Sequence, residues 1–146
     1  MKRFAFVLAG VLASCGHPSE FAERDQQVAS FLTLSCSEMS ATQVPSVTIH
    51  SAEEIKAGEF VPPESSSNGP PADYGNLPTF CRVQGTIKPT PGSNIGFEVW
   101  LPDDWNGKFL QTGNGGAAGS IVHWSMIEPL SRGYAVANTD TGHTGS

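Results

Sequence analysis

Residues 108–119 read Lys-Phe-Leu-Gln-Thr-Gly-Asn-Gly-Gly-Ala-Ala-Gly, a short apolar run that passes into a segment with four glycines, the glycine loop (residues 113–119). The run is typical of a buried strand, and Ser120 is a candidate N-cap for a helix beginning at Ile121. Glycine backbone can adopt positive φ and lie close to a ligand, and a helix N-terminus favours negative charge. The stretch therefore predicts a loop that binds negative charge: a phosphate, a carboxylate, or an oxyanion that forms only during a reaction.

Two segments before the glycine loop alternate between apolar and other residues, as strands in a sheet do. They cover residues 80–87 and 94–101, and residues 89–93 between them contain the prolines and the glycine of a hairpin loop. In the second segment, we expect Glu98 and Trp100 on the face opposite to the apolar residues. The apolar residues that share a face are Cys81, Val83 and Ile87 in the first segment and Ile95, Phe97, Val99 and Leu101 in the second.

The sequence after the glycine loop predicts a helix followed by a buried strand. We expect the helix to break at Pro129 and to end at Gly133, and residues 134–139 form a short apolar run typical of parallel sheets. The order is two antiparallel strands and then a β-loop-α-β unit, whose crossover is expected to be right-handed. This order predicts an α/β protein whose chain is the incomplete N-terminal part of an α/β-hydrolase fold.

Composition limits both size and partners. The chain has 146 residues, 38% of them hydrophobic, and suits one globular domain at most. Its formal net charge of −6 gives no basic surface for nucleic acid, so we expect no such partner.

We divide the chain after its leader into a loop-rich segment with a Pro/Ser/Gly connector, residues 15–79, and the truncated first part of a hydrolase domain, residues 80–146. The glycine-rich residues 141–146 favour the interpretation that a longer protein continues from here.

Residues 1–14 match a secretory signal peptide of the lipoprotein type. Lys2 and Arg3 precede an apolar run that ends in Leu-Ala-Ser-Cys. This ending resembles the bacterial lipobox, in which a lipid is attached to the cysteine, which is Cys15 in this chain. The alternative is an ordinary signal peptide with a chance cysteine at its end. Both interpretations predict export, either to the cell envelope or as a secreted protein, and we expect membrane association only through a lipid anchor at Cys15.

Cys36 and Cys81 remain once Cys15 carries a lipid. Two cysteines in an exported chain most simply form a disulfide, which would attach the loop-rich segment to the strand that contains Cys81. In the chain-entropy model such a bond contributes about 4 kcal/mol to stability. The alternatives are two separate buried thiols, or bonds to cysteines elsewhere in a longer protein.

Three interpretations of the glycine loop stay open on the residues alone. In the first, the backbone N–H groups of Gly115 and Gly116 form part of an oxyanion hole, as the loop after the third strand does in α/β-hydrolases. In the second, Gly113, Gly115 and Ala118 form a relaxed dinucleotide fingerprint, with Asp140 after the next strand. The protein would then be an exported or periplasmic nucleotide- or carboxylate-binding module. In the third, the glycines serve only a tight turn. Export and the preceding antiparallel strands favour the first.

A series of motifs in a fixed order resembles the tannase and feruloyl esterase family, from about Cys36 to the end of the chain. The motifs are Phe80–Val83, Ser93–Pro102, Trp105–Phe109, Gly113–Gly116, Arg132–Ala135 and Asp140–His143. The resemblance implies an exported serine esterase (a carboxylic ester hydrolase) of α/β-hydrolase fold, with a large lid domain that often holds a structural calcium ion. It implies small esters of aromatic acids as substrates, such as gallates, ferulates or mono(2-hydroxyethyl) terephthalate. It also implies a disulfide between positions like Cys36 and Cys81.

The resemblance further implies that the catalytic triad is not in this chain. The nucleophile, acid and histidine of the family, and its lid, belong to sequence downstream of Ser146, so we expect no hydrolysis by the chain alone. We expect no cofactor or metal within it. Of its histidines, His17 lies in the N-terminal tail and His50 in a weakly patterned segment. We expect His123 on a helix surface, and His143 matches a family position for which a structural role is favoured over a catalytic one.

Overall fold

The computed structural model of the chain describes residues 34–63, 70–116 and 119–144, all within one unit that spans Leu34–Ser146. The predictions for the signal peptide, Cys15 and His17 lie outside the described residues, and so does the prediction for Ala118. The helices and strands are α2 (Cys36–Met39), β1 (Val47–Ile55), β2 (Phe80–Ile87), β3 (Ile95–Pro102), β4 (Phe109–Gln111), the 3-10 helix η2 (His123–Met126), α3 (Ile127–Ser131) and β5 (Ala135–Thr139).

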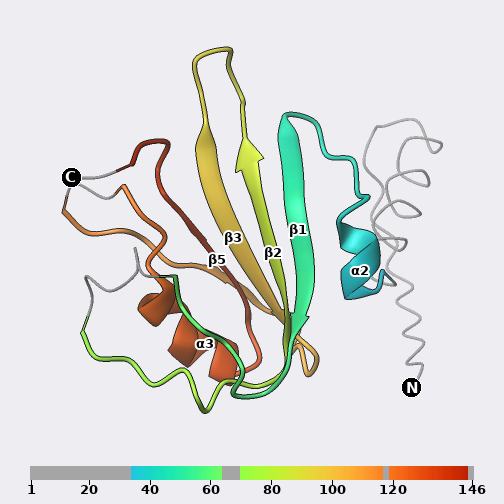
Figure 1. Ribbon diagram of the computed structural model, residues 1–146, viewed down its shortest axis with the longest axis vertical. Coiled ribbons are helices and arrows are strands. Elements are labelled where there is room, and N and C mark those ends of the chain that lie inside the picture. Colours follow the sequence, from blue (N-terminus) through green and yellow to red (C-terminus); the bar gives the residue numbers. More distant parts are fainter. Residues whose placement is uncertain (1–33, 64–69, 117–118, 145–146) are drawn as a thin grey trace, which may run out of the picture. The chain divides into compact units, whose positions relative to one another are not determined.

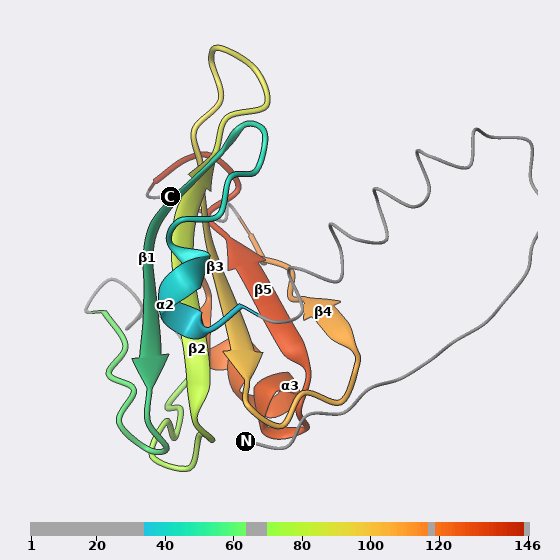
Figure 2. The ribbon, with the colours of Figure 1, turned by 90° about the vertical axis from the view of Figure 1, so that its right-hand side faces the viewer.

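The five strands form one mixed sheet in the order β1-β2-β3-β5-β4, which Figure 2 shows from one side to the other. The pairs β1–β2, β2–β3 and β3–β5 are antiparallel, and the pair β5–β4 is parallel. The predicted strands over 80–87 and 94–101 are present within one residue of their expected bounds, and the predicted sequence of antiparallel strands followed by a β-loop-α-β unit is confirmed. α2 and α3 lie on opposite faces of the sheet (Figures 1 and 2).

β1 lies within the segment that we expected to be loop-rich. It pairs with β2 along its length, apart from a bulge between Ile49 and Ser51 that leaves His50 without a partner in the strand register. All nine of its residues are exposed or half-buried. A strand at the edge of a sheet is held largely by backbone hydrogen bonds, so it needs few apolar residues and gives only a weak sequence pattern.

The core lies between one face of the sheet and the segments that cross it. Trp100, Phe80 and Val136 on the strands are fully buried against residues from the loops and from α3. The covering residues are Phe60, Leu77, Met126 and Leu130. The Phe60 ring meets the Trp100 ring edge-on with 4.7 Å between centroids. The predicted alternation in β3 is therefore present, and the face that contains Glu98 and Trp100 is the fully buried one.

The helix after the glycine loop differs from its prediction at the start and agrees at the end. Ser120 is not its N-cap, because η2 begins only at His123 and has Val122 as its N-cap. Pro129 does not break the helix: it lies in the first turn of α3, where a backbone N–H would have no acceptor within the helix. The helix ends as predicted at Gly133, which has φ of +78° and donates its N–H to the carbonyl of Leu130.

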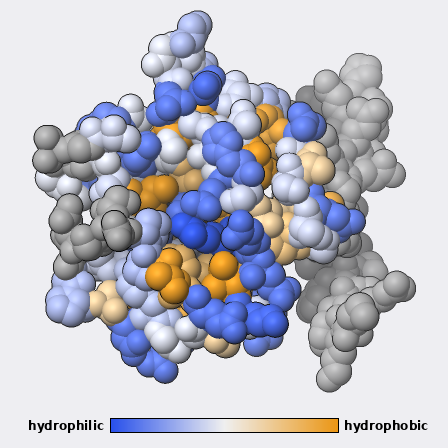
Figure 3. Space-filling model, viewed as in Figure 1, coloured by the Kyte–Doolittle hydropathy of each residue, from blue (hydrophilic) through white to orange (hydrophobic). Residues whose placement is uncertain are grey.

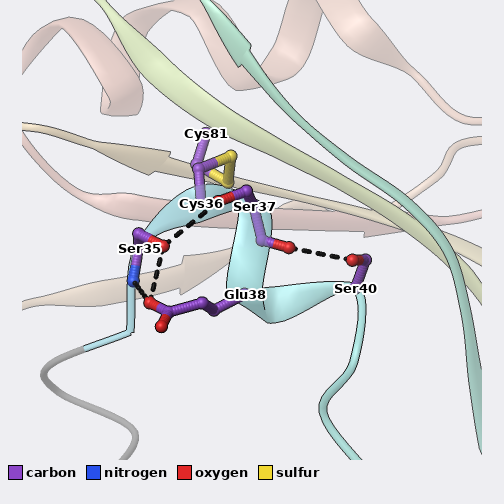
Figure 4. Close-up of a disulfide and its surroundings, with 6 residues drawn as sticks. All are labelled: Ser35, Cys36, Ser37, Glu38, Ser40 and Cys81. Atoms are coloured by element: carbon purple, nitrogen blue, oxygen red, sulfur yellow. Dashed lines mark hydrogen bonds between the residues drawn. A yellow bond between two sulfur atoms is a disulfide. The ribbon is translucent and has the colours of Figure 1, made fainter.

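The disulfide predicted between Cys36 and Cys81 is present, with a Cα–Cα distance of 5.5 Å. It joins α2 to β2, the strand that contains Cys81 (Figure 4). The short helix is stabilised at its N-terminus by Glu38, whose carboxylate accepts hydrogen bonds from the backbone N–H and the hydroxyl of Ser35 at 2.8 and 2.6 Å. The disulfide therefore ties the start of the described chain to the sheet.

Candidate functional site

The glycine loop lies at the carboxyl edge of the parallel strand pair. β4 and β5 run in the same direction, so both end at one edge of the sheet. The glycine loop follows β4 at that edge, and residues 140–143 follow β5. Open α/β sheets usually bind their ligands outside the carboxyl ends of parallel strands. Two of the motifs singled out in the sequence, residues 113–116 and 140–143, thus meet at the edge where binding is expected.

The described part of the glycine loop presents bare backbone to open space. A Cβ atom built on Gly113, Gly115 or Gly116 would have no atom within 4 Å outside its immediate chain neighbours. Gly116 has φ of +61° and Gly119 has φ of +86°, conformations that other residues rarely adopt. An oxyanion hole needs backbone donors at an accessible place, and these glycines offer that. The assignment of Gly115 and Gly116 to the hole stays a prediction.

The contribution expected from a helix N-terminus is wrong. The loop is followed by a four-residue 3-10 helix, and the five-residue α3 begins only at Ile127. Helices this short, starting this far from Gly115 and Gly116, add little dipole field at the loop. Any donors to a bound anion are therefore the backbone N–H groups of the loop itself.

Two asparagines tie the glycine loop to β5. Asn138 is fully buried, and its Nδ2 donates to the carbonyl and the hydroxyl of Thr112 at 3.1 and 2.8 Å. Its Oδ1 accepts the backbone N–H of Val122 at 3.0 Å. Within the loop, Asn114 donates through Nδ2 to the carbonyls of Thr139 and Ser120. The residues on both sides of the loop are thus held by side chains, in addition to the backbone bond from the Thr112 N–H to the Ala137 carbonyl.

Glu98 collects hydrogen bonds from four side chains beneath this region. Its carboxylate accepts from Arg82 at 2.9 and 2.5 Å, from Gln84 at 3.0 Å, from the Trp100 indole at 3.0 Å and from His123 at 3.1 Å. Burial raises the pKa of Glu98, but hydrogen bonds and charge from His123 and Arg82 outweigh burial and lower the pKa to about 2. The carboxylate is therefore ionised at neutral pH and can only accept. Hence Nε2 of His123 carries a proton.

Glu98 and Asn138 belong to one row of polar residues across the buried face of the sheet. Gln84 pairs with Glu98 across β2 and β3, and Glu98 pairs with Asn138 across β3 and β5. We name these three residues the polar row. Glu98 holds His123, and Asn138 holds the backbone of Val122 next to it. The chain that leaves the glycine loop is thus fixed to two neighbouring members of the row.

The sequence prediction for His123 is wrong, and the roles of Glu98 and Asn138 were missed. His123 is only 3% exposed instead of lying on a helix surface. The sequence does hold one signal, since Arg82 and Glu98 both fall outside the apolar faces of two adjacent predicted strands. Asn138 gives no such signal because it lies in an apolar run.

Asp140 is committed to the backbone around it. Its Oδ1 accepts the N–H groups of Gly96 at 2.9 Å and Gly142 at 2.8 Å. A ribose in a dinucleotide site would have to share this carboxylate with two backbone N–H groups, so the geometry disfavours that interpretation. His143 is exposed and contacts the Thr141 hydroxyl through Nδ1 at 3.2 Å. Its role stays a prediction.

A surface cavity of about 540 Å³ lies at the opposite edge of the sheet, where β3 ends and β5 begins. Its lining includes Asp103, Asp104 and Arg132, and it is separate from the glycine loop. In residues 34–63, 70–116 and 119–144, no group of three His, Cys, Asp or Glu side chains is placed to bind a metal ion. Nor does this part of the chain contain a helix long and apolar enough to cross a membrane.

Comparison with known proteins shows which family this part of the chain is similar to. Residues 81–146, which include β2 after its first residue, β3 to β5 and the glycine loop, match the family model of tannase and feruloyl esterase. Residues 81–146 of this chain belong to the tannase and feruloyl esterase family. An uncharacterized esterase of Xanthomonas campestris is 44% identical over 112 residues, which are 76% of this chain and 18% of that protein. Feruloyl esterase C of Talaromyces stipitatus is 34% identical over 106 residues, which are 70% of this chain and 20% of that enzyme.

Two solved esterase structures are similar in fold over 75% of this chain. The crystal structure of feruloyl esterase B from Aspergillus oryzae matches with a TM-score of 0.65 and 28% identity, over 75% of this chain and 22% of that one. An esterase from the same organism matches with a TM-score of 0.64 and 25% identity. The chain thus spans about a fifth of the length of the curated relatives, and it includes the segment that contains the glycine loop.

Proposed function

We propose that this chain is the N-terminal part of an exported serine esterase that hydrolyses esters of aromatic acids, and that its glycine loop supplies one side of the oxyanion hole. The observation that carries the proposal is the open, glycine-lined backbone at the carboxyl edge of β4 and β5 in a chain of this family. Relatives that match this segment are named feruloyl esterases.

Acyl transfer explains why this loop is built from backbone. The carbonyl oxygen of an ester becomes an anion when a nucleophile adds to the carbon, and donors already in place stabilise that anion without reorganisation. N–H groups of Gly115 and Gly116 can be approached closely, because no side chain shields them. The serine nucleophile, the acid and the histidine of the triad come from sequence beyond residue 146, so the chain alone is inactive.

The edge of the sheet fits a larger α/β-hydrolase domain. All three residues of β4 are exposed, including Phe109 at 60% and Leu110 at 41%. An exposed apolar edge strand is a site for pairing with another strand, and proteins rarely leave one uncovered. Figure 3 shows separate apolar patches among hydrophilic residues on the face seen in Figure 1. We propose that a further strand of the same domain pairs with β4, and that the calcium ion typical of the family belongs to its lid.

Export completes the proposal. Lys2, Arg3 and the apolar run that follows direct the protein out of the cytoplasm, and Cys15 receives the lipid. The Cys36–Cys81 disulfide fits an oxidising compartment.

The test replaces single glycines in the full-length protein and measures hydrolysis of ethyl ferulate and methyl gallate. Gly115 suits it, because a methyl group there meets no atom and φ is not in the left-handed region. Gly115→Ala keeps the backbone N–H but places a methyl group where the substrate would approach it, so kcat should fall by about 10-fold, less than the 10²–10³ that a wholly lost oxyanion donor costs. Gly92→Ala in the β2–β3 loop is the matched control, since Gly92 also has open space and no positive φ. Wild-type protein that binds nucleotide and hydrolyses neither ester would overturn the proposal.

A further inference from the structure

We propose that Asn138 is a positioning residue of the glycine loop, whose buried amide fixes Thr112 before the loop and Val122 after it. The inference rests on the proposed oxyanion role of the loop and adds the residue that sets the direction of its N–H groups. Asn138 lies on β5, beneath the loop, and does not reach the surface where substrate would bind.

Both N–H groups of the Asn138 amide are used, and its oxygen accepts one further bond. Nδ2 donates to the carbonyl and hydroxyl oxygens of Thr112, and Oδ1 accepts from the N–H of Val122. The opposite orientation would place Nδ2 against an N–H group and Oδ1 against a carbonyl oxygen. Both contacts would be repulsive, so the surroundings determine which way the amide points. Because Asn138 is 0% exposed, bulk water does not reach these groups, and losing the side chain would leave the buried Thr112 and Val122 groups without this partner.

Neighbouring contacts make this support rigid on both sides of the loop. The Thr112 hydroxyl also accepts from Ser125 at 3.0 Å, and the Thr112 N–H donates to the carbonyl of Ala137 at 2.9 Å. His123, the residue after Val122, is held by Glu98. The loop between these supports contains the glycines, whose backbone is otherwise the most flexible of any residue. Preorganised donors therefore require fixed ends, and Asn138 contacts both.

The experiment uses the full-length enzyme with Asn138→Ala, compared per folded molecule with wild type. We expect kcat for ethyl ferulate to fall by about 10–100-fold, since displacing a catalytic group by about 1 Å can cost 10²-fold. KM should change less than about 3-fold, because the oxyanion exists only in the transition state. Phenylboronic acid, which forms a tetrahedral adduct with a catalytic serine, should bind more weakly in proportion to the loss of kcat/KM. A residue needed only for folding would not change kcat per folded molecule in this way.

Asn106→Ala is the matched control at the other end of the same strands. The Asn106 side chain also bridges two segments, donating to the carbonyl of Arg132 at 2.7 Å and accepting the N–H of Lys108 at 3.0 Å. Asn106 lies before β4, away from the glycine loop, and shares no hydrogen-bond partner with Asn138. The Asn106→Ala enzyme should therefore keep kcat and affinity for phenylboronic acid within about 2-fold of wild type.

Thr112→Val keeps the proposal testable if Asn138→Ala does not fold. Valine preserves the shape but removes the hydroxyl that accepts from Asn138, and kcat should again fall while KM holds. Thr112→Ser restores the hydroxyl and should recover most of that loss. Folded variants with wild-type kcat and wild-type affinity for the boronic acid would overturn the role of Asn138 alone. A wild-type enzyme that neither cleaves the ester nor binds the boronic acid would overturn the proposed function instead.

Discussion

Glu98→Gln should destabilise the sheet at neutral pH and remove part of its sensitivity to acid. The substitution keeps the size of the side chain but removes the charge that Arg82 and His123 face. Arg82 and Glu98 are only 13% and 2% exposed, so water compensates little. Removing one partner of a buried ion pair costs about 3–5 kcal/mol, and the slight exposure of Arg82 places the expected value near 3.

The lowered pKa of Glu98 gives the pH range of this effect. The pKa falls from 4.5 to about 2 on folding, so the ionised carboxylate stabilises the folded state above pH 4.5. That contribution is lost as the pH falls from 4.5 towards 2. At about 1.4 kcal/mol per pKa unit, the whole contribution is about 3 kcal/mol, of which about 2 kcal/mol has gone by pH 3. Wild type and Glu98→Gln should therefore differ strongly at pH 7 and much less at pH 3.

The assay is unfolding in urea. Hydrogen-exchange mass spectrometry of peptides from residues 80–102 monitors the unfolding at each urea concentration. It reports on β2 and β3 whatever else the protein contains. At pH 7 the midpoint should fall by about 1–3 M urea, given typical denaturant sensitivities. Glu128→Gln is the control. The side chains of Arg132 and Glu128 are 62% and 70% exposed, so removing this ion pair should leave the urea midpoint unchanged. If Glu98→Gln kept the wild-type loss of stability between pH 5 and pH 3, Glu98 would not be the paired, ionised group that the structure indicates.

Two further predictions concern the N-terminal part of the chain. Replacing Cys36 and Cys81 together by serine should lower the free energy of unfolding by about 4 kcal/mol in the chain-entropy model, and the melting temperature should fall accordingly. A melting temperature equal to that of the oxidised wild type would show that the disulfide contributes nothing. Expressed in a bacterium, the protein should begin at a lipid-bearing Cys15, and intact-mass measurement that finds an unmodified Met1 or a cleaved form without lipid would contradict this.

The sequence predicted the strands whose pattern is set by burial and missed the contacts set by tertiary packing. β2, β3 and the end of α3 at Gly133 were predictable, because alternation and a positive-φ glycine are local properties. β1 was missed because backbone pairing at an edge needs few apolar residues. The burial of His123 depends on Glu98, 25 residues earlier, and no local pattern reports a contact at that distance.

The polar row also explains why the sheet has one register rather than several. Side chains alternate between faces, so a one-residue slip of β3 would move Glu98 to the opposite face and leave Arg82 and His123 facing apolar residues. Apolar residues alone would resist the slip less, because β3 has apolar residues on both of its faces. The same slip would move Glu98 away from Asn138, and His123 would lose the carboxylate that holds it beside the loop. The charge buried under the sheet therefore specifies the strand register and, through that register, the place of the glycine loop.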